Sequence, residues 1–197
     1  MKPNIRIVVL IALLAVIASG AVATISVFGG TAAEANTEVI EFEVAQNMTK
    51  FVFDEAPVHE DGLPAYGNSF ITQGYIYPEG TLNGSNRALP DGSPEFPDEV
   101  IGEWICRGWF IGDGAHTTTG PIVITTQTYQ FGEEYGNATI VSDGYELAEV
   151  NKEVKQAITG GTGQYQMARG EVTQELLGFT EQMGVNLRFT VEAKLKP

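Results

Sequence analysis

The sequence predicts an all-β protein, built as an eight-stranded antiparallel barrel or sandwich. Apolar and polar residues alternate with a period of two through most of the chain, while the helical period is almost absent. β-Branched and aromatic residues fill the alternating runs, as is typical of strands. Short turn signals separate the runs, so neighbouring strands can pair antiparallel. These signals are Asp61-Gly62, Asn83-Gly84, Asp91-Gly92, Asp113-Gly114 and Asp143-Gly144.

Eight runs qualify as strands, because each combines alternation with flanking turn residues. They are Glu38–Ala45, Ser69–Tyr77, Val100–Ile111, Ile122–Phe131, Asn137–Tyr145, Val154–Thr159, Gln164–Gln174 and Val185–Leu195. The segment Glu146–Lys155 could hold one helical turn. The segment 78–97 holds four prolines and three glycines and has no period, which predicts a long loop. Loops of this length in a compact domain are usually binding loops or disordered.

The N-terminus has the layout of a secretory signal peptide. Lys2 and Arg6 precede an apolar run over residues 7–23, and Ala33-Glu34-Ala35 offers a small-x-small cleavage pattern. We therefore expect a signal peptide at 1–35 and one domain over 36–197. The alternative is a retained membrane anchor, since the apolar run approaches the length of about 20 residues that spans a bilayer. Either interpretation predicts a secreted or otherwise extracytoplasmic domain.

The charge excludes two classes of partner. The whole chain has a formal net charge of −14, and removing two cations (Lys2 and Arg6) and one acid (Glu34) makes it −15. A strongly acidic surface repels nucleic acid and anionic lipid, so neither is an expected partner. Cys106 is the only cysteine, and His59 and His116 are the only histidines. An intrachain disulfide is therefore excluded, and a metal site or a Ser-His-Asp triad has little support.

The segment 158–170, which is rich in glycine, is the most informative stretch of the chain. Gly160-Gly161-Thr162-Gly163 is not followed by Gly-Lys-Ser/Thr, and the segment after it reads as a strand. Phosphate cradles of this type need a helix N-terminus at that point, so a nucleotide site is disfavoured. The pattern indicates a tight bend at a barrel corner, where glycine permits positive φ and close backbone approach.

The same segment carries a resemblance to a known family. Gly161–Gly170, with the sequence GTGQYQMARG, resembles the Gly-Thr-Gly-x-aromatic-x-x-Ala-Arg-Gly motif of dirigent proteins. Phe131–Asn137, the stretch near Tyr145, and Ala157–Gly161 resemble plant allene oxide cyclases. The resemblance runs from about residue 100 to 195. It implies an eight-stranded antiparallel β-barrel, often a homotrimer, with an apolar interior pocket and no metal or organic cofactor.

The resemblance also implies a function. Allene oxide cyclases close a ring in an unstable fatty-acid epoxide, and dirigent proteins orient phenoxy radicals that a separate oxidase generates. Both act chiefly by positioning their substrates, which can supply a large part of a reaction barrier. We therefore expect a barrel that steers cyclisation or coupling of a small apolar or phenolic molecule, as a cofactor-independent, isomerase-like enzyme. The alternatives are a non-catalytic carrier of an apolar ligand and a structural or interaction barrel.

Arg169 is the first candidate site residue. Strand alternation places it on one face with Tyr165 and Met167. If that face lines the barrel, Arg169 could bind a carboxylate or stabilise an oxyanion, and the other two would contact the ligand. The alternative is a structural ion pair with Glu43 or Glu171.

Four further residues complete the predicted site. By resemblance, Tyr145 lies near a pocket tyrosine of the cyclases, and a first-strand glutamate, Glu41 or Glu43, matches a functional glutamate. The ordinary reading of the acidic face of that first strand is a solvated outer surface. Cys106 falls close to a pocket cysteine of the cyclases and shares a strand face with Trp104, so both are predicted to line the ligand site. A lone strand cysteine is more often a small buried hydrophobe. The predicted catalytic residues are thus Arg169, Tyr145 and Glu43.

Overall fold

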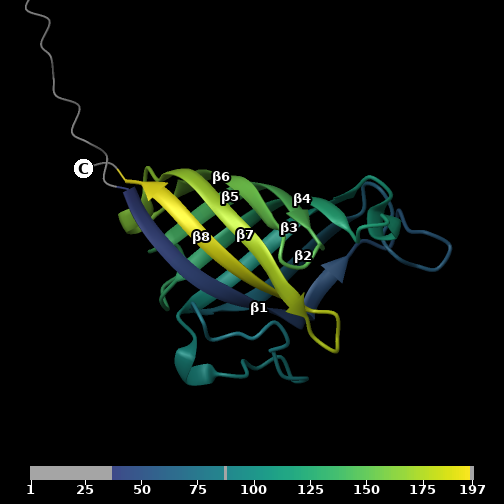
Figure 1. Ribbon diagram of the computed structural model, residues 1–197, viewed down its shortest axis with the longest axis horizontal. Helices are drawn as coiled ribbons and strands as arrows, with labels where there is room; N and C mark the ends of the chain where they lie inside the picture. The colour runs from purple at the N-terminus through teal and green to yellow at the C-terminus, as the bar shows by residue number, and fades with distance from the viewer. Residues whose placement is uncertain (1–36, 87, 196–197) are drawn as a thin grey trace, which may run out of the picture. The chain divides into compact units, whose positions relative to one another are not determined.

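A computed structural model describes residues 37–86 and 88–195, which form a closed barrel of eight antiparallel strands in sequence order (Figure 1). The fold predicted from the sequence is confirmed. The predicted signal peptide at 1–35 lies outside the described residues. Within the described part of the chain, no helix is long and apolar enough to span a membrane.

The strands lie close to the predicted ranges. They are β1 Thr37–Phe53, β2 Ser69–Pro78, β3 Gly102–Ile111, β4 Ile122–Phe131, β5 Thr139–Leu147, β6 Glu153–Gly161, β7 Arg169–Phe179 and β8 Val185–Lys194. Three single-turn 3-10 helices occupy connections: η1 Pro97–Glu99, η2 Gly114–His116 and η3 Gly163–Tyr165. The helical turn expected within Glu146–Lys155 does not form, because this segment continues β5, turns at Asn151 with φ 60°, and enters β6.

Strand β1 is longer than predicted because it contains a bulge. Asn47 pairs with Gln73 and Val52 pairs with Ile71, so five steps along β1 match two steps along β2. These two counts differ by an odd number, so residues of β1 that would have faced outward face inward after the bulge, and the reverse. Beyond the bulge Phe53 therefore pairs with the inward-facing Phe70.

Strand β7 starts five residues later than predicted. Residues 163–165 form η3 instead, with Tyr165 N–H donating to the Thr162 carbonyl over 2.9 Å. Gly163 has φ +57° and packs against the carbonyl of Asn137, a position that tolerates no Cβ. Met167 follows with φ 92°. The bend predicted for the glycine-rich segment is therefore present, but it extends through Met167.

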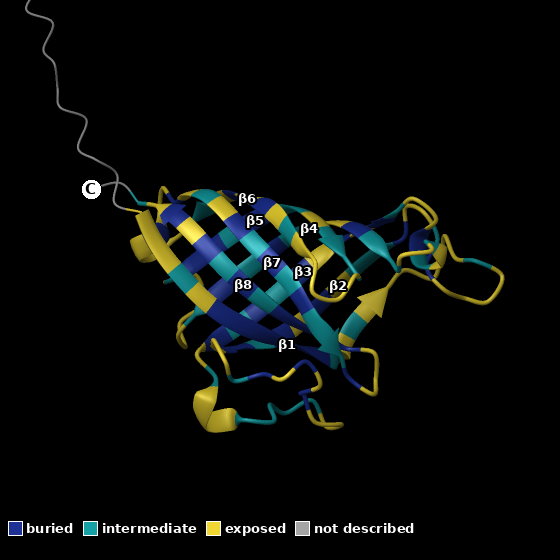
Figure 2. Ribbon diagram, viewed as in Figure 1, coloured by how far each residue is buried: buried dark blue, intermediate teal, exposed yellow. Residues whose placement is uncertain are grey.

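Buried and exposed residues alternate along most of the strands, while the middle of β1 is buried on both faces (Figure 2). Towards the end where β5 begins, the interior is aromatic. Phe42 stacks on Phe189 with ring centroids 5.2 Å apart and meets Tyr129 edge-on at the same distance. Tyr165 is buried at this end, 5.9 Å from the ring of Phe131. The glycine-rich segment thus closes one end of the barrel with packed side chains.

Residues 79–86 and 88–101, between β2 and β3 and here called the strap, lie on the outer side of β1 (Figure 1). Leu82 is buried in a second apolar cluster with Ala45 and Tyr77, and Phe96 packs against that cluster. The strap also covers Glu43 on β1, which is fully buried. The predicted long loop is therefore an ordered part of the barrel wall rather than a free connection.

Candidate functional site

A set of polar side chains occupies the barrel interior between the aromatic end and the opposite mouth. All come from β3 to β7, and all face inward because each strand alternates. We call this set the interior polar cluster. Its members are Trp104, Cys106, Thr125, Gln127, Tyr129, Ser142, Glu146, Gln156 and Gln174.

Glu146 is the one carboxylate of the interior polar cluster. Its Oε2 accepts a hydrogen bond from Gln127 Nε2 over 3.4 Å and lies 3.7 Å from the Cys106 thiol. The residue is half-buried near the end of β5, so it is still reachable from the mouth. Burial raises its pKa to about 7, and the hydrogen bonds from Cys106 and Gln174 act in the opposite direction without offsetting burial. At neutral pH the carboxyl is therefore partly protonated.

The Gln127 amide has its orientation fixed by its neighbours. The indole Nε1 of Trp104 can only donate, and it donates to Gln127 Oε1 over 2.7 Å. The Nε2 group must then face the other way, where it donates to Gln174 Oε1 over 2.6 Å and to Glu146. The buried tryptophan thereby aims an N–H group at the carboxylate.

The rest of the interior polar cluster is a chain of neutral groups. Gln156 Nε2 donates to Gln174 Oε1 over 3.0 Å, and Ser142 Oγ donates to Gln156 Oε1 over 2.7 Å. The Tyr129 hydroxyl lies 3.0 Å from Ser142 Oγ. Burial raises the pKa of Tyr129 well above its usual value, so the phenol stays neutral. These groups satisfy one another's hydrogen-bonding capacity and form a continuous polar network inside the barrel.

Thr125 is the exception within this network. Its side chain is buried on β4 beside the weakly hydrogen-bonding Cys106 thiol, and its hydroxyl makes no well-formed hydrogen bond with the described residues. Tyr77 OH and Asn186 Oδ1 are also buried without a partner among the described residues, but they lie on the outer face beneath the strap. A buried hydroxyl without a partner costs free energy, so an inward one close to Glu146 indicates a group that a ligand could satisfy.

Aromatic rings line the same end of the barrel. Phe110 on β3 pairs with Val123 on β4, which pairs with Glu146 on β5. Phe70 lies 5.4 Å from Phe110, and Phe51 lies 6.0 Å from Phe70, between ring centroids. An aromatic wall and a carboxyl that titrates near neutrality therefore lie at one mouth.

Trp104 and Cys106, predicted as ligand-lining residues, both belong to the interior polar cluster. Each is about 1% exposed. Burial and the nearby Glu146 carboxylate raise the pKa of the Cys106 thiol well above its usual value. The thiol is therefore protonated, which favours a packing and hydrogen-bonding role over that of a nucleophile.

The structure separates the other predicted residues. The expectation that Arg169, Tyr165 and Met167 share a strand face is wrong, because β7 begins only at Arg169. Arg169 is exposed and donates to the Ala168 carbonyl over 2.7 Å, and the side chain of Met167 is 55% exposed. Tyr165 is buried, but at the end of the barrel far from Glu146. A structural pair of Arg169 with Glu43 or Glu171 does not form either.

Glu43 and Tyr145 both lie on the outer face. Glu43 does not have the solvated position expected for that face, because the strap and Arg188 cover it completely. Tyr145 is 54% exposed and points away from the interior. The structure thus does not bring Arg169, Tyr145 and Glu43 together. Their catalytic roles stay a prediction.

Sequence reasoning missed Glu146 because it ended the fifth strand at Tyr145. The strand continues to Leu147, so Glu146 keeps the inward alternation of Ser142 and Gly144. The sequence does contain a signal for Glu146. If the alternation of inward residues at Ser142 and Gly144 is continued by two residues, Glu146 lies on the inner face. An acid two residues after the turn signal Asp143-Gly144 gives no reason to prefer strand over turn.

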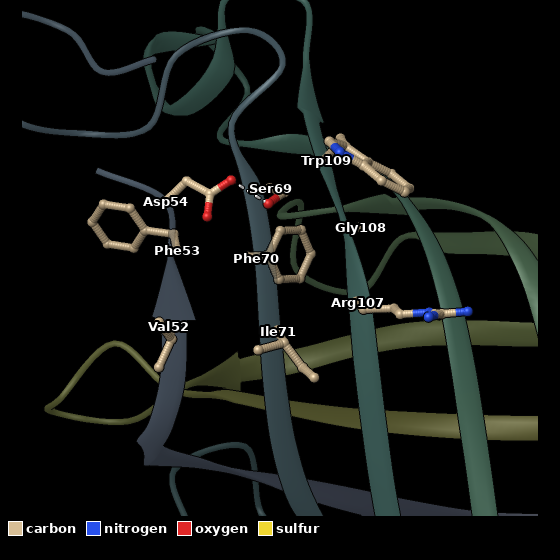
Figure 3. A pocket seen from close by; sticks show the side chains of 9 residues that line it. All are labelled: Val52, Phe53, Asp54, Ser69, Phe70, Ile71, Arg107, Gly108 and Trp109. Carbon is tan, nitrogen blue, oxygen red and sulfur yellow. Dashed lines mark hydrogen bonds between the residues drawn. The ribbon is translucent and has the colours of Figure 1, made fainter. Parts of the chain in front are cut away.

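A separate hollow of about 290 Å3 lies at the ends of β1, β2 and β3. Its exposed lining includes Val52, Ile71 and Trp109, and Ser69 Oγ donates to Asp54 Oδ2 over 2.5 Å at its edge (Figure 3). The described residues contain no group of three metal-binding side chains. A second hollow, of about 260 Å3, is lined by residues of β1, the strap and the β7–β8 connection, among them Met48, Leu89 and Thr180.

Comparison with known proteins supports the fold. Neither a protein-family model nor a curated protein matches the chain. The solved structure of a pterocarpan synthase dirigent protein matches with a TM-score of 0.59 at 13% identity, over 83% of this chain and 98% of that one. A second pterocarpan synthase dirigent protein gives 0.54 at 14% identity, over 83% and 91%. A pyocyanin demethylase gives 0.50 at 14%, over 78% and 100%. The chain therefore has the barrel fold of dirigent proteins.

Proposed function

We propose that this barrel binds a small aromatic or apolar molecule at the mouth near Glu146 and steers its cyclisation or coupling, with Glu146 as the proton-transferring group. One observation carries the proposal. Glu146 lies on the inner face of β5 with a pKa raised to about 7 by burial, beside a network of neutral hydrogen-bonding groups and at the end of the barrel where Phe70 and Phe110 pack. General acid–base groups work best when their pKa lies near the operating pH.

The arrangement supplies three parts of such a site. Phe51, Phe70 and Phe110 offer apolar rings for a substrate to pack against. Gln127 holds the carboxyl in place through an amide whose orientation Trp104 fixes. The Thr125 hydroxyl offers one more hydrogen bond. Chemistry by positioning and proton transfer requires no organic cofactor, and we propose that none is used.

The proposed location and assembly of the domain rest on its N-terminal sequence and on the family resemblance. We propose that the domain acts outside the cytoplasm after removal of residues 1–35, and that it assembles as a homotrimer. If its chemistry is radical coupling, a separate oxidase supplies the radical. The second candidate function is a carrier that holds an aromatic ligand without converting it.

Native mass spectrometry after incubation with a panel of phenolic and apolar aromatic compounds tests binding, and chromatography of the same mixtures tests conversion. We expect Glu146→Gln to retain a neutral ligand but to lose turnover about a hundredfold, the usual scale for a general acid–base group. Glu41→Gln, an exposed acid of β1, is the matched control and should leave both unchanged. Retention of a ligand without conversion by the wild type would favour the carrier. No retained compound would contradict both functions.

A further inference from the structure

The lack of a positively charged neighbour for Glu146 indicates the charge of the ligand that the site binds. Every described lysine and arginine is exposed except Arg188, which is half-buried on the outer face and bound to Glu43. Lys152, on the connection that follows β5, is exposed and pairs with Glu149 over 2.6 Å. Among the described residues, Glu146 thus has no cationic partner.

The groups that face Glu146 from the neighbouring strands are all neutral. They are the Cys106 thiol on β3, the Gln127 amide and the Tyr129 phenol on β4, and the Gln174 amide on β7. Carboxylates buried in proteins are ordinarily paired with a cation, coordinated to a metal or protonated. This carboxylate lacks a cation of its own, and the described residues offer no metal cluster.

Aromatic rings strengthen the case for a cationic ligand. A cation over a ring face is attracted by the ring quadrupole, and the attraction grows when the site excludes water. Phe51, Phe70 and Phe110 pack together at the end of the barrel where Glu146 lies, and Phe110 is in register with Glu146 across β4. A planar cation could stack on this wall and place its charge against the carboxylate.

We infer that the site selects aromatic molecules that carry a positive charge, such as a protonated or N-alkylated nitrogen heterocycle, and that Glu146 is their counter-ion. This inference rests on the proposed function, since it names the substrate class of the same site. It also disfavours fatty-acid and other carboxylate ligands, because they would place a second negative charge beside Glu146 without a cation to offset it.

The ligand cation and a proton compete for the same carboxylate. If the free carboxyl has a pKa of about 7, it is ionised in roughly a tenth of the molecules at pH 6 and in nearly all at pH 8. The apparent affinity for a cation scales with this fraction. Binding of an aromatic cation should therefore tighten about tenfold from pH 6 to pH 8.

The test compares N-methylquinolinium with its neutral isostere 1-methylnaphthalene, measured by fluorescence titration at pH 6, 7 and 8 and constant ionic strength. We expect the cation to bind wild-type protein more tightly than the isostere at pH 8, with the tenfold pH dependence. Glu146→Gln should weaken cation binding at pH 8 by about tenfold or more and remove the pH dependence. Binding of the neutral isostere should change little.

Glu41→Gln provides the matched control, because Glu41 is an exposed acid on the outer face. It removes the same charge without touching the site, so it should bind both probes as wild type does. Equal losses in the two variants would overturn the inference, since they would indicate diffuse attraction to an acidic surface. Equal affinity for the two probes, or a flat pH profile, would also overturn it. Conversion of a neutral substrate that depends on Glu146 would then leave the proposed function intact.

Discussion

Glu43 and Glu146, both removed from solvent at least in part, differ in whether a cation balances the carboxylate. Glu43 lies on the outer face of β1 under the strap, where Oε1 accepts from Arg188 Nη2 over 2.9 Å and Oε2 accepts from the Leu82 N–H over 2.7 Å. Glu146 lies on the inner face of β5 with neutral donors only. A buried acid with a dedicated cation is a structural element, whereas one without a cation keeps a pKa near neutrality and can exchange a proton or bind a ligand.

The surroundings of Arg188 reinforce this difference. Its guanidinium also lies 3.4 Å from Glu175 and 3.9 Å from Glu79 on the strap. These acids, with Glu43, raise the pKa of Arg188 further, so the group is permanently charged. The Glu43–Arg188 pair therefore joins the strap, β1 and β8 into one unit.

The largest effect is expected at the structural acid. Glu43→Ala should lower the free energy of unfolding by about 3 kcal/mol, because it leaves the Leu82 N–H buried without an acceptor and removes the partner of Arg188. Urea denaturation measures this change. Glu41→Ala, two residues earlier and exposed, should change stability by less than about 0.5 kcal/mol. Similar values for the two variants would show that the strap is not held by this pair.

The next effect has the opposite sign and depends on pH. Glu146→Gln should raise the free energy of unfolding by about 2 kcal/mol at pH 8, and the gain should vanish below about pH 4.5. The folded protein keeps the Glu146 proton up to about pH 7, whereas the unfolded chain releases it near 4.5. The folded state thus binds more protons in this window, and wild-type stability falls as pH rises through it.

Urea denaturation of both proteins at pH 4.5, 6, 7 and 8 measures this difference. The increase in the free energy of unfolding that Glu146→Gln causes should grow between pH 4.5 and 7 and then level off. A constant difference across the whole range would contradict the assignment of a raised pKa to Glu146. Glu41→Gln again serves as the control, since an exposed carboxylate should not change the shape of the pH profile.

The smallest effect concerns the hydroxyl without a partner. Thr125→Val should be neutral or stabilise the fold by up to about 1 kcal/mol, because the buried hydroxyl lies beside the weakly hydrogen-bonding Cys106 thiol and makes no well-formed hydrogen bond with the described residues. Thr72→Val is the matched comparison: its hydroxyl accepts from Gln46 Nε2 over 2.9 Å, so its loss should cost about 1 kcal/mol. Thermal denaturation in the absence of ligand separates the two. A clear loss in Thr125→Val would indicate a hydrogen bond to bound water.

The order of strands could be predicted from the sequence, but the site could only be predicted in part. Trp104 and Cys106 were placed inside correctly, because the alternation of β3 runs unbroken over ten residues. Arg169 and Met167 were misplaced because Gly163 and the positive φ of Met167 end the alternation that the sequence appears to continue. Tyr145 and Glu146 differ by one residue, which in a strand is the difference between the outside and the inside.

The sequence by itself determined that the chain forms eight antiparallel strands, because the period of two and the turn residues are local properties. It also determined that the barrel is acidic and contains no intrachain disulfide. Only the tertiary structure decided which acid is paired. Glu43 meets Arg188, 145 positions further along the chain, while Glu146 meets no cation. Barrel closure brings β8 against β1, and contacts between residues so far apart depend on that closure rather than on any local pattern.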